Sequence, residues 1–260
     1  PEVFYQIFGR QDWAYYFLSQ AFIIFSFFIV YKLAKEFLKN EVHALLSVFL
    51  LEGIYFYNFT TPEFNVNICQ IPFWTLTVYY FWQCFKNDKV QSWALLGLFA
   101  ALGVLSKYLF IYLLIGMVVF FIFKLKKIKK FNFKYFIPIT VFLLVLTPHF
   151  IWLIENDYKT ITYGLKRTSL ENSNFLNHLF YPLKFILKQI GILIPFFFLL
   201  SLIVSKNKNK FKFNLRDEKL VYLTCITFVP IVLMFLTSLI FGANIRTMWM
   251  TPFYLFFGLL

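Results

Sequence analysis

Charged side chains are scarce in this 260-residue sequence, and their scarcity excludes an ordinary water-soluble fold. Only 14% of the residues are Asp, Glu, Lys or Arg, whereas 60% are hydrophobic and the mean hydropathy is +0.71. A single aqueous domain of this length cannot bury so much apolar surface in its core. We therefore expect an integral membrane protein that is solvated by lipid.

Several catalytic and nucleotide-binding motifs are also missing. The chain has no Walker-type phosphate loop, dinucleotide-binding glycine fingerprint, nucleophile elbow or HExxH zinc motif. These absences argue against ATP-driven transport and NAD chemistry. The three cysteines, Cys69, Cys84 and Cys225, stand alone in apolar runs without metal-ligand partners nearby, so we interpret them as packing residues.

The charge that is present is strongly basic. The sequence has 25 Lys and Arg against 12 Asp and Glu, which gives a formal net charge of +13. The basic residues adjoin apolar segments and are not interleaved in a nucleic-acid recognition pattern. We therefore predict anionic membrane lipids as their partners and no nucleic acid.

Apolar segments of transmembrane length follow one another along the chain. A transmembrane helix needs roughly 20 apolar residues. The predicted spans are 12–34, 42–59, 66–85, 92–106, 108–124, 135–154, 190–205 and 220–241, with a ninth beginning near residue 251. We predict an all-α, polytopic bundle of about 8–9 transmembrane segments, formed as one domain over residues 1–260. Because Pro1 opens inside a polar-aromatic stretch and Leu260 falls inside an apolar run, we also expect a fragment truncated at both ends.

The basic residues orient the predicted spans. Seventeen of the twenty-five Lys and Arg fall in alternate loops, most densely at 124–134 and 206–219. Because positively charged loops remain cytosolic, these loops are predicted to face the cytosol. The loops predicted to face outside are 1–11, 60–65, 106–107, 155–189 and 242–250.

Two acidic residues lie in or near the predicted hydrocarbon layer, where a carboxylate is costly and usually has a function. Glu52 lies within the predicted span 42–59, where it either pairs with another helix or is a protonated packing residue. Glu63 follows Pro62 at a predicted helix start, and Asn65 and Asn67 add polar groups to the same corner. Glu63 is either part of an anion-facing site or a cap favoured by the helix macrodipole.

Three basic or titratable residues are predicted on the same side as Glu63. Lys107, between two short spans, either extends to the interface or holds a phosphate as a point charge. Arg246 has a planar fork that suits two phosphate oxygens, although with Trp249 nearby it could be an ordinary interface anchor. His149 could donate to a bound anion or satisfy a neighbouring helix.

The predicted outer loop 155–189 ends in a stretch of alternating apolar and basic residues at 181–188. This spacing is typical of a helix that lies in the membrane interface, where it could border a lipid entry portal. A plain connector is the alternative interpretation.

Five segments together carry a resemblance to a known family. Residues 61–65 followed by 72–74, then 97–108, 148–157 and 246–252, resemble the membrane glycosyltransferases of family 39 type, which have the GT-C fold. These include relatives of protein O-mannosyltransferases and of lipid A aminoarabinose transferases. The resemblance spans nearly the whole chain, and it depends on the order and spacing of the segments because each is weakly specific alone.

The resemblance implies specific roles for the candidate residues. Glu63 occupies the family's second acidic position, which is more often Asp, and is the candidate catalytic residue. Lys107 occupies the basic corner that meets the donor phosphate, with Arg246 and His149 as further phosphate-binding candidates and Asn65 and Asn67 as supporting polar groups. The principal catalytic Asp of the family is expected upstream of Pro1. Some relatives hold a divalent ion, but this sequence offers no sufficient set of ligands, so we predict neither metal nor other cofactor.

These observations lead to one functional hypothesis and a rival. We expect sugar transfer from a polyprenyl-phosphate donor to a glycolipid or protein acceptor, at the outer face of a bacterial plasma membrane. The rival is a transporter or lipid flippase with an outward-facing charged cavity, which would also use broken helices and intramembrane charges. A noncatalytic membrane scaffold is a third possibility, which an acid and a base on one side make less favourable.

Overall fold

The protein is helical throughout the part of the chain that the structure describes. A computed structural model describes residues 1–126, 132–168, 174–204 and 217–260. In these residues every regular element is an α-helix or a 3-10 helix, which confirms the predicted all-α membrane fold. The basic positions 127–130 and 206–216 lie outside the described residues.

The described elements follow one another along the chain in this order. The α-helices are α1 (Glu2–Phe8), α2 (Asp12–Phe37), α3 (Glu41–Phe49), α4 (Tyr55–Asn58), α5 (Val66–Asn87), α6 (Val90–Ser106), α7 (Ile111–Leu125), α8 (Phe136–Glu155), α9 (Lys159–Lys166), α10 (Asn177–Val204) and α11 (Glu218–Phe241). The 3-10 helices are η1 (Leu50–Gly53), η2 (Tyr108–Phe110), η3 (Phe133–Tyr135), η5 (Thr247–Tyr254) and η6 (Phe257–Leu259).

Five described helical segments are long and apolar enough to cross a membrane, fewer than the eight or nine predicted. They are Asp12–Phe37, Tyr108–Leu125, Phe133–Glu155, Asn177–Ile203 and Glu218–Phe241. The predicted span 92–106 forms the shorter apolar helix α6. The predicted span 66–85 forms α5, which is long but is not among the five because polar side chains interrupt its apolar sequence.

Three other predicted boundaries are wrong. The predicted span 42–59 is divided into α3, η1 and α4, with Ile54 in an extended conformation between the last two. The predicted interface helix at 181–188 belongs to the continuous helix α10, which begins well before the predicted span 190–205. The apolar run near residue 251 forms the 3-10 helices η5 and η6, whose side chains are mostly buried.

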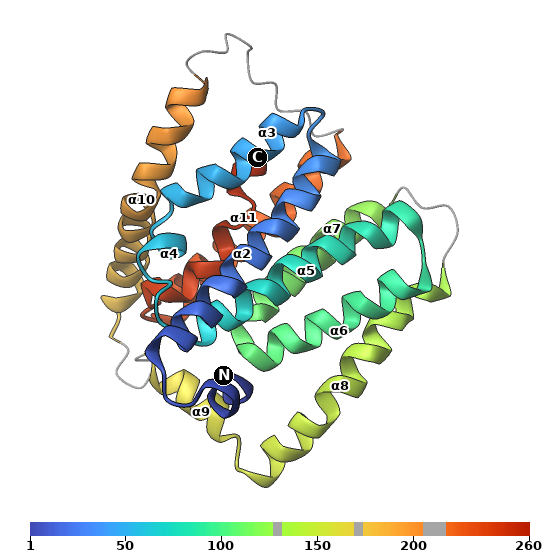
Figure 1. The fold of residues 1–260 in the computed structure, drawn as a ribbon. Helices are drawn as coiled ribbons and strands as arrows, with labels where there is room; N and C mark the ends of the chain where they lie inside the picture. Colours follow the sequence, from blue (N-terminus) through green and yellow to red (C-terminus); the bar gives the residue numbers. More distant parts are fainter. Residues whose placement is uncertain (127–131, 169–173, 205–216) are drawn as a thin grey trace.

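Helix α5 occupies the middle of the bundle. It packs against α2 and α6, α6 packs against α8, and α7 packs against α11, which also contacts α10. In Figure 1, α8 and α10 consequently lie at opposite edges of the molecule. The glycines of α6 and α7 allow these close contacts, since a Cβ at Gly116 would lie 2.8 Å from the carbonyl oxygen of Cys225 on α11.

Charged residues from the predicted cytosolic loops gather at one end of the bundle. The Glu36 carboxylate accepts from Trp82 Nε1 at 2.9 Å and from Gln83 Nε2 at 2.6 Å, and it pairs with Lys86 at 3.1 Å. The Lys219 ammonium donates to the Glu36 carbonyl, which brings the start of α11 to the same place. These contacts tie α2, α5 and α11 together at the end opposite the candidate site.

Candidate functional site

The start of α5 and the end of α6 meet at the other end of the bundle. Asn65 is the N-cap of α5, and its Oδ1 accepts from the backbone N of Asn67 at 2.9 Å. This contact satisfies one of the amide groups that a helix start leaves free. The capping role considered for Glu63 therefore belongs to Asn65, and the first turn of α5 contains no acidic residue.

A hydrogen-bonded chain runs from this cap to Lys107. The side chain of Asn67 donates through Nδ2 to Asn65 Oδ1 at 3.0 Å, and its Oδ1 accepts from Lys107 Nζ at 2.5 Å. The indole ring of Trp249 lies beneath the ammonium, with 5.2 Å between Nζ and the ring centroid. Asn67 and Trp249 are both buried, whereas Lys107 is half-buried. We call Asn65, Asn67, Lys107 and Trp249 the Lys107 network.

The charge on Lys107 is not neutralised by a neighbouring acid. Among the described residues no carboxylate forms an ion pair with its ammonium. Burial, and secondarily the positive charge of Arg167, lowers the pKa of Lys107 to about 7. A carbonyl oxygen and an aromatic face stabilise a cation, but less than a carboxylate would. The ammonium is therefore suited to an anionic group that arrives from outside the protein.

The next residue, Tyr108, belongs to a second set of hydrogen-bonded side chains. Its hydroxyl lies 2.8 Å from His149 Nε2 on α8 and 2.6 Å from Thr160 Oγ1 on α9. The imidazole of His149 also stacks on Trp152, with ring centroids 5.9 Å apart. The structure thus links His149 to the Lys107 corner through the hydroxyl of Tyr108.

Glu63 and Arg246 lie on the segments that flank the Lys107 network. Both side chains are exposed, and no hydrogen bond or ion pair within the described residues joins either of them to Lys107. Glu63 precedes the cap of α5 by two residues, and Arg246 is the N-cap residue of η5. The backbone N of Trp249 donates to the Arg246 carbonyl at 3.0 Å, which ties the position of the arginine to the ring under Lys107.

The sequence did not reveal four participants in this region. In the sequence Trp249 is only a neighbour of Arg246, yet in the fold its ring lies beneath the ammonium of Lys107. No strong local pattern points to Tyr108 or to Thr160 and Arg167. The segment that carries Tyr108 and the one that carries Thr160 and Arg167 come together only in the fold. A tyrosine immediately after a lysine at a span boundary was the one local signal available.

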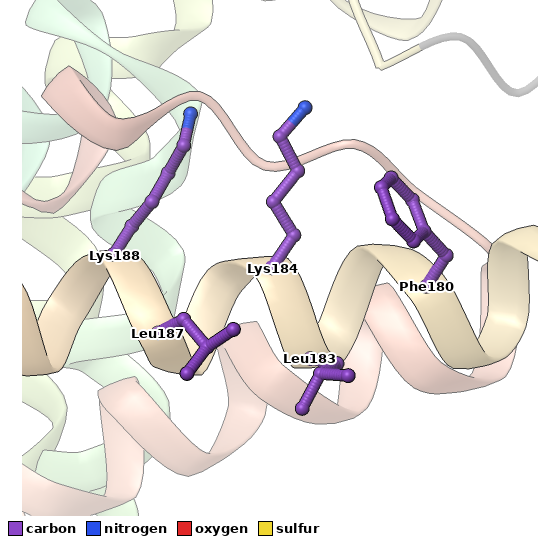
Figure 2. Close-up of a pocket in the computed structure, with 5 residues that line it drawn as sticks. All are labelled: Phe180, Leu183, Lys184, Leu187 and Lys188. Atoms are coloured by element: carbon purple, nitrogen blue, oxygen red, sulfur yellow. The ribbon is translucent and has the colours of Figure 1, made fainter.

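Two cavities lie along α10, and no residue of the Lys107 network lines either of them. The larger, of about 400 Å³, lies along α10 and is lined by Phe180, Leu183, Lys184, Leu187 and Lys188 (Figure 2). The second, of about 340 Å³, continues along α10 from Lys188 to Pro195 and is also lined by Tyr55 and Thr247. Among the described residues, no three His, Cys, Asp or Glu side chains gather as a metal site.

The fold and the polar network together indicate a membrane protein with a binding site for an anionic group. Near the end of the apolar helices, the half-buried ammonium of Lys107 donates to Asn67, which in turn donates to Asn65, and it lies over the indole ring of Trp249. This arrangement is suited to an amphiphile with an anionic headgroup.

The family follows from comparison with known proteins. The family model of dolichyl-phosphate-mannose-protein mannosyltransferases matches residues 2–152, which is more than half of the chain. The chain belongs to this family, and it is therefore a membrane glycosyltransferase of the kind that uses a polyprenyl-phosphate-linked sugar donor. No curated protein and no solved structure gives a significant match.

Proposed function

We propose that this protein transfers a sugar from a polyprenyl-phosphate donor to a glycolipid or protein acceptor at the outer face of a bacterial plasma membrane, with the donor phosphate bound at Lys107. The observation that carries this proposal is the ammonium group of Lys107, which has no acidic partner among the described residues and is oriented by Asn67 and Trp249. A lipid-linked donor brings its phosphate to the membrane interface, and such a cation can stabilise the charge that develops there.

The proposed reaction is a displacement at the anomeric carbon of the sugar. The bond between that carbon and the phosphate oxygen breaks, and the polyprenyl phosphate leaves with the bonding electrons. A new bond forms from the anomeric carbon to the acceptor hydroxyl oxygen, whose proton passes to a carboxylate. Among the described residues, we assign the stabilisation of the leaving phosphate to Lys107 and the acceptance of the proton to Glu63, whose exposed side chain forms no ion pair there.

The remaining candidates take supporting parts in the proposal. Arg246, which is exposed at the N-cap of η5, would contact a second phosphate oxygen after donor binding. His149 would act through Tyr108, with which it shares a 2.8 Å contact, and Asn65 and Asn67 would hold the ammonium in position. No metal or other cofactor is part of the proposed reaction.

Donor binding tests the role of Lys107 directly. The native protein in lipid nanodiscs should bind a polyprenyl-phosphate sugar, and Lys107→Ala should weaken this binding about tenfold or more, since a hydrogen bond to a charged group contributes roughly 1.5–3 kcal/mol. Lys159→Ala is the matched control, because Lys159 is an exposed lysine of α9. Equal loss of affinity in both variants would show that only the overall charge matters and would contradict a site at Lys107.

Turnover tests Glu63 and separates the proposal from its rival. Glu63→Gln should bind the donor normally and should transfer radiolabelled sugar about 10²–10⁴ times more slowly, as expected for a lost general base. Glu155→Gln is the control, because Glu155 is an exposed acid at the end of α8. Unchanged transfer in Glu63→Gln would refute the catalytic assignment. Movement of intact donor across the membrane without cleavage would favour the transporter or flippase.

A further inference from the structure

The first half of α10 carries a lysine pair that the proposed function does not use. Lys184 and Lys188 are separated by one helical turn, and their side chains extend from the same face of the helix (Figure 2). Leu183 and Leu187 extend from another face and are 57% and 61% exposed. Residues at positions i and i+4 of a helix have Cβ atoms about 5–6 Å apart, so both ammonium groups can reach one phosphate.

Both lysines are available for an external anion. Among the described residues neither forms an ion pair, and the Lys184 ammonium lies over the Phe180 ring, whose centroid is 5.8 Å from Nζ. Lys188 is exposed and lines both cavities, which adjoin at this residue, and we call the two together the α10 groove. The far part of this groove is lined by Gly191, Ile192 and Pro195 and contains no charged side chain of α10.

The length of α10 places the lysine pair at the boundary between headgroups and hydrocarbon. The helix has 28 residues, and at 1.5 Å per residue it is about 42 Å long, whereas the hydrocarbon layer is about 30 Å thick. An untilted helix of this length extends about eight residues beyond the hydrocarbon. The sequence from Gln189 to Ile203 has no charged residue, so the excess falls at the start of the helix, where Lys184 and Lys188 are located.

We propose that this groove is a binding site for an anionic glycerophospholipid, whose phosphate lies between Lys184 and Lys188 and whose acyl chains follow the apolar part of α10. The charge of the lysine pair complements a phosphate, and the uncharged stretch beyond it complements a hydrocarbon chain. None of the groove residues belongs to the Lys107 network, which the proposed function assigns to the sugar donor. We therefore assign the groove to a bilayer lipid and the Lys107 network to the sugar donor.

Native mass spectrometry of the detergent-solubilised protein provides the test. The probes are phosphatidylglycerol, zwitterionic phosphatidylcholine and a short polyprenyl phosphate, each titrated separately. The native protein should prefer phosphatidylglycerol over phosphatidylcholine by about tenfold to thirtyfold, since each lysine near an anionic surface contributes roughly fivefold. The double variant Lys184→Gln/Lys188→Gln should lose this preference, while its residual phosphatidylcholine binding reports an intact fold.

Matched variants distinguish a defined site from a general effect of charge. Lys159→Gln/Lys166→Gln removes two exposed lysines from α9 and should retain the preference for phosphatidylglycerol. Lys107→Ala should retain it as well, which separates this proposal from the assignment of donor binding to Lys107. Equal loss of preference in the α9 control would overturn the proposal.

Two competition arms identify the source of the phosphate. Inorganic phosphate at millimolar concentration should not displace phosphatidylglycerol, because it lacks the acyl chains that the groove contacts. Displacement by inorganic phosphate would reduce the site to a simple anion site. Stronger binding of polyprenyl phosphate than of phosphatidylglycerol, lost in Lys184→Gln/Lys188→Gln, would show that the occupant is the isoprenoid carrier, and the proposal would be wrong.

Discussion

Donor binding should depend on pH through the protonation of Lys107. Its pKa is lowered to about 7 by burial, so the free protein carries a mixture of charged and neutral Lys107 near neutral pH. A sugar phosphodiester remains anionic over this range and binds the charged form more tightly. Affinity should therefore be fully present below pH 7 and should fall as the pH rises through the pKa of Lys107.

The size and width of this change follow from the strength of the contact. A hydrogen bond to a charged group contributes roughly 1.5–3 kcal/mol, which corresponds to about a 10-fold to 150-fold change in affinity. The same free energy raises the pKa of Lys107 in the complex by about 1–2 units. The dissociation constant should thus increase by up to tenfold per pH unit above pH 7 and level off near pH 8–9.

Two substitutions at position 107 isolate the titrating group. In Lys107→Arg the guanidinium stays protonated at every accessible pH and can stack on Trp249, so tight binding should persist to pH 9. Lys107→Met should bind weakly at every pH. The measurement is a titration with a fluorescent polyprenyl-phosphate analogue in nanodiscs between pH 6 and 9. A native dissociation constant that does not change with pH, or an identical change in Lys107→Arg, would refute the reasoning.

Four further outcomes are expected. The folded-state pKa of Lys107 lies below its ordinary value of 10.5, so between pH 7 and about 10 the folded protein binds fewer protons than the unfolded protein, and its stability rises with pH. In Lys107→Met the melting temperature should lack this rise with pH. An equal rise in both proteins would contradict the burial of the ammonium. Trp249→Leu removes the ring beneath Lys107 and should weaken donor binding about 2-fold to 30-fold, the range of a cation–π contact; unchanged affinity would exclude this contribution. Gly116→Val forces a side chain against Cys225 of α11 and should cost about 1–3 kcal/mol, read as a lower melting temperature, and an unchanged value would be inconsistent with this helix contact. Gln70→Leu should raise the melting temperature, because the buried amide of Gln70 has no hydrogen-bond partner among the described residues, and a decrease would indicate a partner that only the membrane-embedded protein provides.

The sequence by itself determined the class of fold and several of the polar residues that matter. Long apolar runs predicted the helices that became α2, α7, α8 and α11, because hydropathy over about 20 residues is a local property that survives folding. The same local reasoning selected Asn65, Asn67 and Lys107, since polar groups at the ends of apolar segments are few and costly. The structure brings these three together through direct hydrogen bonds.

Only the tertiary structure decided how the remaining residues are arranged. The apolar pattern of 42–59 does not reveal the break at η1, where Gly53 packs against the backbone of Phe196 on α10. Trp249 contacts Lys107 although the two lie far apart in sequence, and the hydroxyl of Tyr108 contacts Thr160 on α9. The roles proposed for Glu63 and Arg246 remain predictions, because their exposed side chains are not fixed by packing within the fold. Hydropathy and capping act over one or two helical turns, whereas these contacts depend on which helices pack together, and that choice is made by side-chain shape across the whole bundle.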